Sequence, residues 1–175
     1  MIRVALFEPE KPANTGNIIR TCMAFDCALT IIGPTTFEIS DKAFLRAKMD
    51  YGVGFPIERI ATIDSFLAKY KAENGYFITR YADKTYTKME ADDPAKDVFF
   101  LFGRESTGIP KNVLKRYPGR DLRIPMAINA RSLNLSNSVA IIVSEALRQQ
   151  SFHGLALREE IKGEDFLSRY PEGKE

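Results

Sequence analysis

The chain has 175 residues, which suits one domain with a full-size core, and its 45% hydrophobic and 27% charged residues are ordinary for a soluble globular protein. No apolar run reaches the roughly 18 residues of a membrane-spanning helix, and the amino terminus lacks the zones of a signal peptide, so we expect a cytoplasmic protein without a membrane partner. The formal net charge of +2 neither requires nor excludes a nucleic-acid partner.

Apolar, β-rich segments alternate with helical patterns along the chain. The strand segments are almost continuously apolar, as in strands buried on both faces of a parallel sheet. We predict an α/β fold in which residues 1–150 form one domain, a parallel sheet with helices on both faces, and the charged tail at 151–175 forms a short helix or frays. In chain order, the expected strands are 2–7, 29–32, 56–60, 76–79, 98–102 and 122–124, and the expected helices are 15–25, 42–50, 63–72, 110–117 and 135–150.

Few residues could hold a metal ion or serve a histidine-dependent mechanism. His153 is the only histidine, and the spacing of Cys22 and Cys27 puts them on different faces of a helix. A zinc site needs more ligands, and Ser/His or Cys/His catalysis needs a histidine near the other motifs. We therefore expect no metal and interpret both cysteines as buried free thiols.

The segment PANTGNIIR follows the first expected strand and begins the first helix. Asn14 or Thr15 can cap that helix, and Arg20 lies off its apolar stripe. The plain interpretation of Arg20 is a surface arginine. The functional one is an anion-binding arginine, because the guanidinium fork matches a phosphate.

The segment FFLFGRESTGIP contains the end of an expected strand and the turn that follows it. Gly103 allows a sharp turn and a close approach of a ligand to the backbone, and Glu105 is the only carboxylate of this turn. The chain has neither a complete G-x-G-x-x-G nor a G-x-x-x-x-G-K-[ST] motif, so dinucleotide-binding and P-loop functions are disfavoured. Taken alone, the segment is also explained as a simple strand-to-helix loop.

The segment RSLNLSNS precedes the last long helix with more short polar residues than one helix cap needs. Its alternation predicts that Leu133 and Leu135 face the interior while Ser132, Asn134 and Ser136 line the opposite side. Hydroxyl and amide groups there can bind a polar ligand, cap the helix and bond neighbouring loops.

These segments, and TRYADKTY after the strand at 76–79, all leave the carboxyl ends of expected strands. In open parallel sheets that edge is where ligands bind. We therefore expect one crevice formed by Asn14, Arg20, Gly103, Glu105, Ser132 and Asn134. Clusters of basic residues lie near the motifs, although charge alone favours solvated faces. They are Lys42, Arg46 and Lys48; Arg80, Lys84 and Lys88; and Lys111, Lys115, Arg116, Arg120 and Arg123.

Three ordered segments, PxNTGNIIR, FGxExxGIP and IPM…RSLNLSNSVAIIVSEALRQ, together resemble the three motifs of SPOUT-class RNA ribose 2′-O-methyltransferases. Within that class the chain is similar to the small TrmL/YibK-like subfamily, which acts on the wobble cytidine or uridine of tRNA, and DKAFLRAKMDY also looks like that subfamily. The resemblance runs from Met1 to about Gln150. It includes the chain length and the lack of an added RNA-binding domain.

The resemblance implies a SPOUT-type fold with a C-terminal trefoil knot, S-adenosyl-L-methionine as cofactor, and a homodimer whose active site lies at the subunit interface. It also implies binding to the tRNA anticodon stem-loop and methyl transfer to the ribose 2′-OH of the wobble nucleotide. The residues that it assigns to catalysis are Arg20, Asn14 and Glu105, and those that it assigns to the cofactor are Ile78, Gly103, Ile124, Met126, Ser132 and Asn134.

Two alternatives remain open on the sequence. One is a 2′-O-methyltransferase that modifies another tRNA site or ribosomal RNA. The other is a non-catalytic RNA-binding protein of the same fold, which binding of S-adenosylmethionine would exclude.

Overall fold

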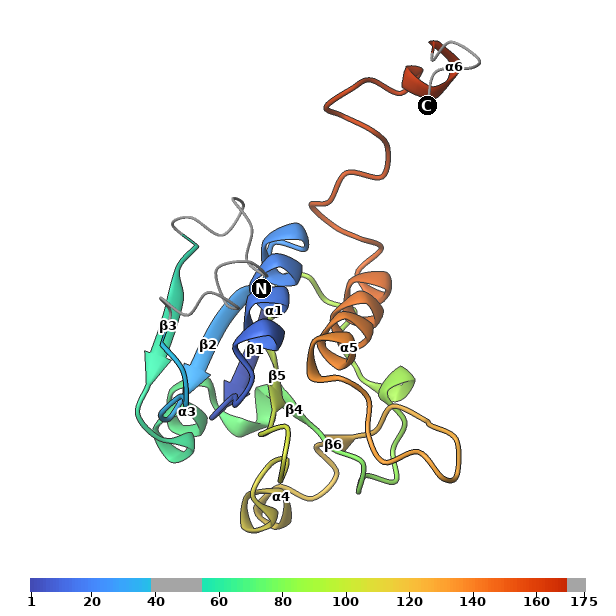
Figure 1. The fold of residues 1–175 in the computed structure, drawn as a ribbon. Helices are drawn as coiled ribbons and strands as arrows, with labels where there is room; N and C mark the ends of the chain where they lie inside the picture. Colours follow the sequence, from blue (N-terminus) through green and yellow to red (C-terminus); the bar gives the residue numbers. More distant parts are fainter. Residues whose placement is uncertain (39–54, 170–175) are drawn as a thin grey trace.

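The computed structural model describes residues 1–38 and 55–169, and its centre is a parallel sheet of six strands (Figure 1). The strand order is β3-β2-β1-β5-β4-β6, and every pairing is parallel. This confirms the predicted parallel α/β sheet. The strands are β1 (Ile2–Phe7), β2 (Ala28–Ile32), β3 (Ile57–Ile60), β4 (Gly75–Ile78), β5 (Val98–Phe102) and β6 (Asp121–Leu122).

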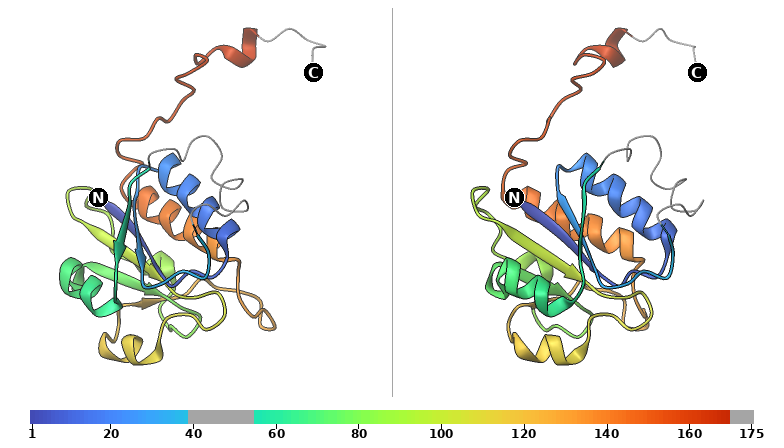
Figure 2. Two further views of the ribbon diagram at one scale, coloured as in Figure 1. Left: turned by 60° about the vertical axis from the view of Figure 1, so that its left-hand side comes forward. Right: turned by 90° about the vertical axis from the view of Figure 1, so that its left-hand side faces the viewer.

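Helices cover both faces of the sheet, as expected (Figure 2). One face carries α1 (Pro12–Ala24) and α5 (Leu135–Gln149), and the other carries α3 (Ile63–Tyr70) and α4 (Lys111–Arg116). Short 3₁₀ turns lie at Ala72–Asn74 and Tyr86–Lys88. The predicted helix at 42–50 lies outside the described residues.

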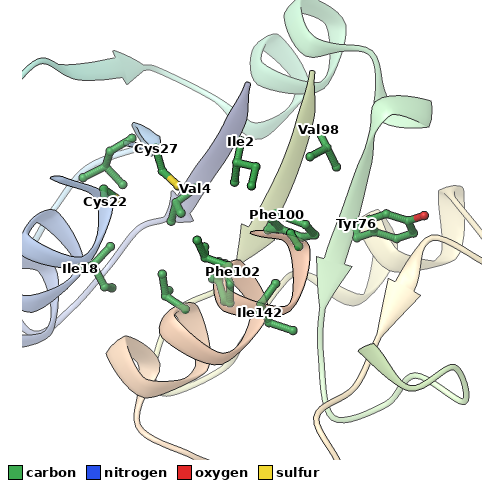
Figure 3. Close-up of a cluster of buried hydrophobic side chains, with 14 of the residues drawn as sticks. Ile2, Val4, Ile18, Cys22, Cys27, Tyr76, Val98, Phe100, Phe102 and Ile142 are labelled. Carbon is green, nitrogen blue, oxygen red and sulfur yellow. The ribbon is translucent and has the colours of Figure 1, made fainter. Parts of the chain in front are cut away.

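The two faces hold separate hydrophobic clusters because side chains alternate along each strand. Phe100 and Phe102 of β5 point toward α1 and α5, where they join Ile18 and Ile142 (Figure 3). Phe99 points the other way and meets Phe66 of α3 edge-to-face, with ring centroids 5.0 Å apart. A strand buried on both sides has no polar face, which explains the unbroken apolar segment VFFLF.

The irregular segment at 79–97 follows β4 and lies against the C-terminal part of the fold. The amide of Tyr86 donates to the carbonyl of Arg123, and the amide of Arg123 donates to the carbonyl of Lys84, both at 2.9 Å. Near the end of α5, the amide of Ala91 donates to Gln149 Oε1 at 3.0 Å. The segment therefore touches both the strand before the RSLNLSN segment and the helix after it.

The tail at 151–169 leaves the amino end of the sheet and extends away from the body (Figure 1). It contains the short helix α6 (Phe166–Arg169), and its large apolar side chains Leu157, Ile161 and Leu167 are exposed. None of the helices in the described ranges is long and apolar enough to span a membrane.

Both cysteines are free and buried, as predicted, and burial raises the pKa of each thiol.

Candidate active site

A pocket of about 680 Å³ opens at the carboxyl ends of β4, β5 and β6, beside the start of α1 and α5. That position agrees with the general location of ligand sites in open parallel sheets. Asn14 and Glu105 line it, and so does every residue that the resemblance assigned to the cofactor. Those residues are Ile78, Gly103, Ile124, Met126, Ser132 and Asn134.

Gly103 closes the wall of this pocket after β5. A Cβ atom at this position would lie 2.0 Å from the backbone carbon of Gly108 and 2.1 Å from the nitrogen of Ile109. The loop folds back so tightly that the amide of Gly108 donates to the carbonyl of Arg104 at 2.9 Å. Gly103 is therefore required for the close approach of two backbone segments.

Glu105 ties the loop after β5 to the loop after β1. Its two carboxylate oxygens accept hydrogen bonds from the amide of Glu10 at 2.8 Å, from the amide of Lys11 at 3.2 Å and from Nδ2 of Asn14 at 2.9 Å. All three donors come from the start of α1 or the residues before it. The carboxylate thus fixes where α1 begins relative to the pocket.

The same two loops are joined in the opposite direction. The carboxylate of Glu10 accepts from the amide of Ser106 at 2.8 Å and from its hydroxyl at 2.6 Å. Beside this contact, Arg104 forms an ion pair with Glu8. The reciprocal contacts make a clasp between residues 8–11 and residues 104–106, which lends rigidity to one wall of the pocket.

The short polar residues of RSLNLSNS hold the motif segments together. Nδ2 of Asn134 donates to Oδ1 of Asn14 at 2.9 Å, which links this segment to α1 and, through Asn14, to Glu105. Oδ1 of Asn134 accepts from the amide and the hydroxyl of Ser136, at 2.9 and 2.6 Å, and so caps α5. A chain of hydrogen bonds therefore connects all three motif segments.

The prediction that Asn14 or Thr15 caps α1 is wrong. The helix begins at Pro12 after Lys11, with no side-chain cap, and both Asn14 and Thr15 are buried within it. Proline is favoured in the first helical turn because it lacks an amide hydrogen there. The Asn14 amide is consequently available for Glu105 and Asn134.

The prediction that Leu133 faces the interior is also wrong, because this side chain is 39% exposed and lines the pocket. Leu135 is half-buried, and the polar Ser136 is buried. Residues 127–134 are irregular and contain a turn in which the amide of Ala130 donates to the carbonyl of Ala127. The alternating pattern therefore does not set the facing of these side chains.

Arg20 is the one predicted site residue that the chain does not bring to the pocket. It is exposed on α1, six positions after Asn14, or about 9 Å farther along the helix axis. It makes no hydrogen bond or ion pair with any residue in the described ranges. The other predicted residues converge without it.

Sequence reasoning missed several residues at the pocket, mainly cations. Lys11, Arg80, Arg104 and Arg131 line it together with a single carboxylate, Glu105. The exposed Tyr81 stands at the same opening. The available signal was the segment TRYADKTY, which leaves β4 at the pocket edge.

The pocket fits S-adenosylmethionine in size and in the chemistry of its wall. Binding pockets of small ligands usually measure about 300–1,000 Å³ and combine apolar surface with a few polar groups. Ile78, Ile124 and Met126 offer apolar surface for an adenine ring, and Ser132 and Asn134 add hydroxyl and amide groups. In the described part of the chain, no three histidine, cysteine, aspartate or glutamate residues gather as a metal site would require.

Comparisons with known proteins agree with this geometry. A family model described as the SpoU rRNA Methylase family matches residues 1–144. Over 155 residues, the chain is 49% identical to a protein of Geobacillus stearothermophilus named "Putative tRNA (cytidine(34)-2'-O)-methyltransferase", covering 89% of this chain and 99% of the relative.

Two solved structures extend the comparison. One, described as giving structural insights into the 2-OH methylation of C/U34 on tRNA, superposes with a TM-score of 0.77 at 30% identity, over 87% of this chain and 98% of the other. The second is an AdoMet-bound rRNA methyltransferase from Sinorhizobium meliloti, with a TM-score of 0.74 and 31% identity over 89% of this chain and 57% of the other.

Proposed function

We propose that this chain, which belongs to the SpoU rRNA methylase family, transfers a methyl group to the ribose 2′-OH of nucleotide 34, the wobble cytidine or uridine of tRNA. The observation that carries the proposal is the chain of hydrogen bonds from Glu105 through Asn14 to Asn134, which joins the three family motifs around one pocket. We assign the activity to a single domain over residues 1–150.

The cofactor is S-adenosyl-L-methionine, which supplies an electrophilic methyl group on its sulfonium when it is bound. Ile78, Ile124 and Met126 would hold the adenine and ribose in the pocket, while Gly103 lets the backbone come close. Ser132 and Asn134 would contact the polar groups. Alignment of the ribose hydroxyl in such a site can contribute up to about 7–11 kcal/mol to lowering the barrier.

Asn14 and Glu105 act as positioning residues in this proposal. The oxygens of Glu105 already accept three hydrogen bonds from the loop and helix that they hold. The side-chain amide of Asn14 donates to Glu105 through Nδ2 and accepts from Asn134 through Oδ1. Arg20 is the residue proposed to touch the substrate. Because a guanidinium stays protonated, Arg20 would lower the pKa of the ribose hydroxyl or grip the adjoining phosphate rather than take the proton itself.

We infer that the active protein is a homodimer. Arg20 is exposed and does not line the pocket of its own chain, so a second copy would be needed to bring it beside a cofactor. A two-fold arrangement, the commonest in soluble oligomers, would give each pocket the Arg20 of the other subunit.

We also propose that the C-terminal part is threaded as a trefoil knot. The support is the position of the segment at 79–97, which contacts Arg123 before the RSLNLSN segment and Gln149 at the end of α5. A chain that passes beneath such a segment and returns along the sheet would leave contacts of this kind on both sides.

The anticodon stem-loop is the proposed RNA partner, because the ribose of an unpaired loop nucleotide is accessible without melting a duplex. Lys111 and Lys115 are exposed on α4 and are candidates for phosphate contacts, whereas Arg116 is engaged by Asp64 at 2.6 Å. Lys42, Arg46 and Lys48 lie outside the described residues. Binding should weaken steeply with salt. We also propose that the protein acts in the cytoplasm.

A second candidate function is methylation of ribosomal RNA, favoured by the likeness to the rRNA methyltransferase of Sinorhizobium meliloti. This chain covers only 57% of that protein, however, whereas it covers 99% of its wobble-methyltransferase relative. The tRNA substrate is therefore preferred.

The test is methylation of total tRNA in vitro with labelled S-adenosylmethionine, followed by mapping of the product. We expect the label on the ribose of a wobble pyrimidine. Label only on bases, or only in ribosomal RNA offered in parallel, would overturn the substrate assignment. Calorimetry that detects no cofactor binding to folded protein would overturn the enzyme assignment and leave a non-catalytic RNA-binding protein.

A further inference from the structure

The mouth of the pocket carries one exposed aromatic side chain. Tyr81 lines the pocket, yet it is 60% exposed. Large aromatic side chains are normally covered in a folded protein, because each can bury about 150–250 Å² of surface. Its position at the site, rather than its exposure alone, suggests that the ring serves a ligand.

The backbone on both sides of Tyr81 is held in place. Its amide donates to Oγ1 of Thr79 at 3.3 Å, and the next residue, Ala82, is buried. Arg80 donates from Nη1 to the carbonyl of Arg131 at 3.0 Å, which ties this loop to the segment that lines the opposite side of the pocket. The ring is therefore presented from an anchored loop.

Two cations lie close to the same ring. The guanidinium carbon of Arg80 is 5.7 Å from the ring centroid, and Nζ of Lys111, which comes from α4, is 5.5 Å away. Neither cation has a carboxylate partner within the described ranges. An aromatic ring beside two cations that no carboxylate neutralises matches the two parts of a nucleotide, because a base can stack on the ring while the cations meet the phosphates.

We propose that Tyr81, with Arg80 and Lys111, is a stacking platform for a base of the substrate RNA next to the nucleotide being methylated. This inference rests on the proposed function and adds the residue that holds the substrate loop. S-adenosylmethionine carries a net positive charge, so a rim with two cations that no carboxylate neutralises suits the polyanionic RNA better than the cofactor. The cofactor has its apolar surface deeper in the pocket, at Ile78, Ile124 and Met126.

The test measures RNA and cofactor binding separately for Tyr81→Ala and Tyr81→Phe. Stacking on an aromatic side chain is worth about 1–3 kcal/mol per base, so Tyr81→Ala should weaken binding of an anticodon stem-loop by about 5- to 150-fold. Tyr81→Phe keeps the ring and should stay within about twofold of the wild type. The affinity for S-adenosylmethionine, measured by calorimetry, should be unchanged in both variants.

Two further measurements distinguish the loss of stacking from a disturbed structure of the loop that carries Tyr81. Stem-loops with 2-aminopurine at each loop position in turn should show altered fluorescence at one position, and Tyr81→Ala should abolish that change. Lys111→Ala should weaken binding and reduce its salt dependence, whereas Lys96→Ala, which removes the same charge beside Met1 at the amino end of the sheet, should do neither.

The inference is overturned if Tyr81→Ala binds the stem-loop as tightly as the wild type, if the wild type does not bind it, or if cofactor affinity falls in parallel. Methylation is scored independently. A protein that binds RNA through Tyr81 without methylating it would refute the proposed function alone. A protein that methylates nucleotide 34 with no contribution from Tyr81 would refute the platform alone.

Discussion

The two ends of the sheet each contain a hollow and a hydrogen-bonded carboxylate, but the two are built differently. The amino end has the larger hollow, about 1020 Å³, and the pocket at the carboxyl end measures about 680 Å³. At the amino end, Glu58 is bound by Lys69 at 2.5 Å and by Arg3 at 3.3 Å. At the carboxyl end, Glu105 is bound by two backbone amides and Asn14.

This difference decides what each end can do. Arg3 and Lys69 are both paired with the carboxylate of Glu58, so this cluster stabilises the edge of the sheet. Glu105 accepts its hydrogen bonds from amides and not from cations. Within the described residues, the neighbouring Lys11, Arg80 and Arg131 therefore have no carboxylate partner, and their charges can attract a ligand. The size of a hollow is therefore a poorer guide to function here than the kind of partner that each charged group has.

The largest expected effect comes from Arg20, which lies outside both hollows. Arg20→Ala should lower the turnover number by about 100-fold or more, as when an electrostatic contact to the reacting group is lost, while S-adenosylmethionine binding is largely spared. Single-turnover kinetics and calorimetry measure the two properties. Parallel loss of activity and cofactor affinity would instead assign Arg20 to the cofactor or the structure.

Mixed dimers show whether Arg20 serves its own pocket or that of the other subunit. Arg20→Ala and the pocket variant Gly103→Val should each be inactive alone. If Arg20 acts across the interface, dimers with one chain of each kind regain one working site and about half of the wild-type activity per dimer. Absence of recovery in isolated mixed dimers would contradict this arrangement.

A methyl group added at Gly103 should damage the carboxyl-end pocket more than a methyl group added at any other position. Gly103→Ala forces a Cβ against the backbone of Gly108, so we expect the free energy of unfolding to fall by about 3 kcal/mol. The affinity for the cofactor should fall as well. Gly119→Ala is the control, because Gly119 has a φ of +80° and open space around it, and should cost about 1 kcal/mol. Equal losses in urea unfolding would argue against the tight turn.

The two carboxylates provide the direct comparison of the ends. Glu105→Gln and Glu58→Gln each replace an oxygen by an amide nitrogen that faces N–H or O–H donors, and each should cost about 1–3 kcal/mol of stability. Only Glu105→Gln should also weaken cofactor binding. A loss of cofactor affinity in Glu58→Gln would mean that the two ends are coupled.

The smallest expected effect is in the pH dependence of stability. Burial raises the pKa of Glu58, but hydrogen bonds from Lys69, Thr30 and Tyr70 and the charge of Arg3 outweigh it and hold that pKa at about 2, below the ordinary 4.5. The stabilisation is full above pH 4.5 and is lost as the pH falls toward 2. Chemical unfolding across this window should show a shallower slope for Glu58→Gln, and an unchanged slope would contradict the depressed pKa.

Most of the fold could be predicted because apolar periodicity reflects burial directly. The strand segments at 2–7 and 98–102 match β1 and β5 residue for residue. Helix boundaries were less accurate: α1 begins at Pro12 rather than at residue 15, since the polar Asn14 and Thr15 appear to be caps until their tertiary partners are known.

The candidate site could be predicted in part for a similar reason. Residues such as Gly103 and Asn134 belong to recognisable motifs, and they meet because their strands end at one edge. The orientation of Leu133 and the place of Tyr81 depend on loop turns and long-range contacts, which local patterns do not encode. Arg20 could not be located at the site from one chain, because its proposed partner is another subunit.

Hydrogen–deuterium exchange with and without S-adenosylmethionine tests most directly the claim that the functional site lies at the carboxyl end of the sheet. We expect slower exchange of amides in the loop at 103–108 and in the segment at 126–135 when the cofactor is present. Exchange at 147–155, beside the larger hollow, should not change. Protection confined to 147–155, with none at 103–108, would contradict a functional site at the carboxyl end of the sheet.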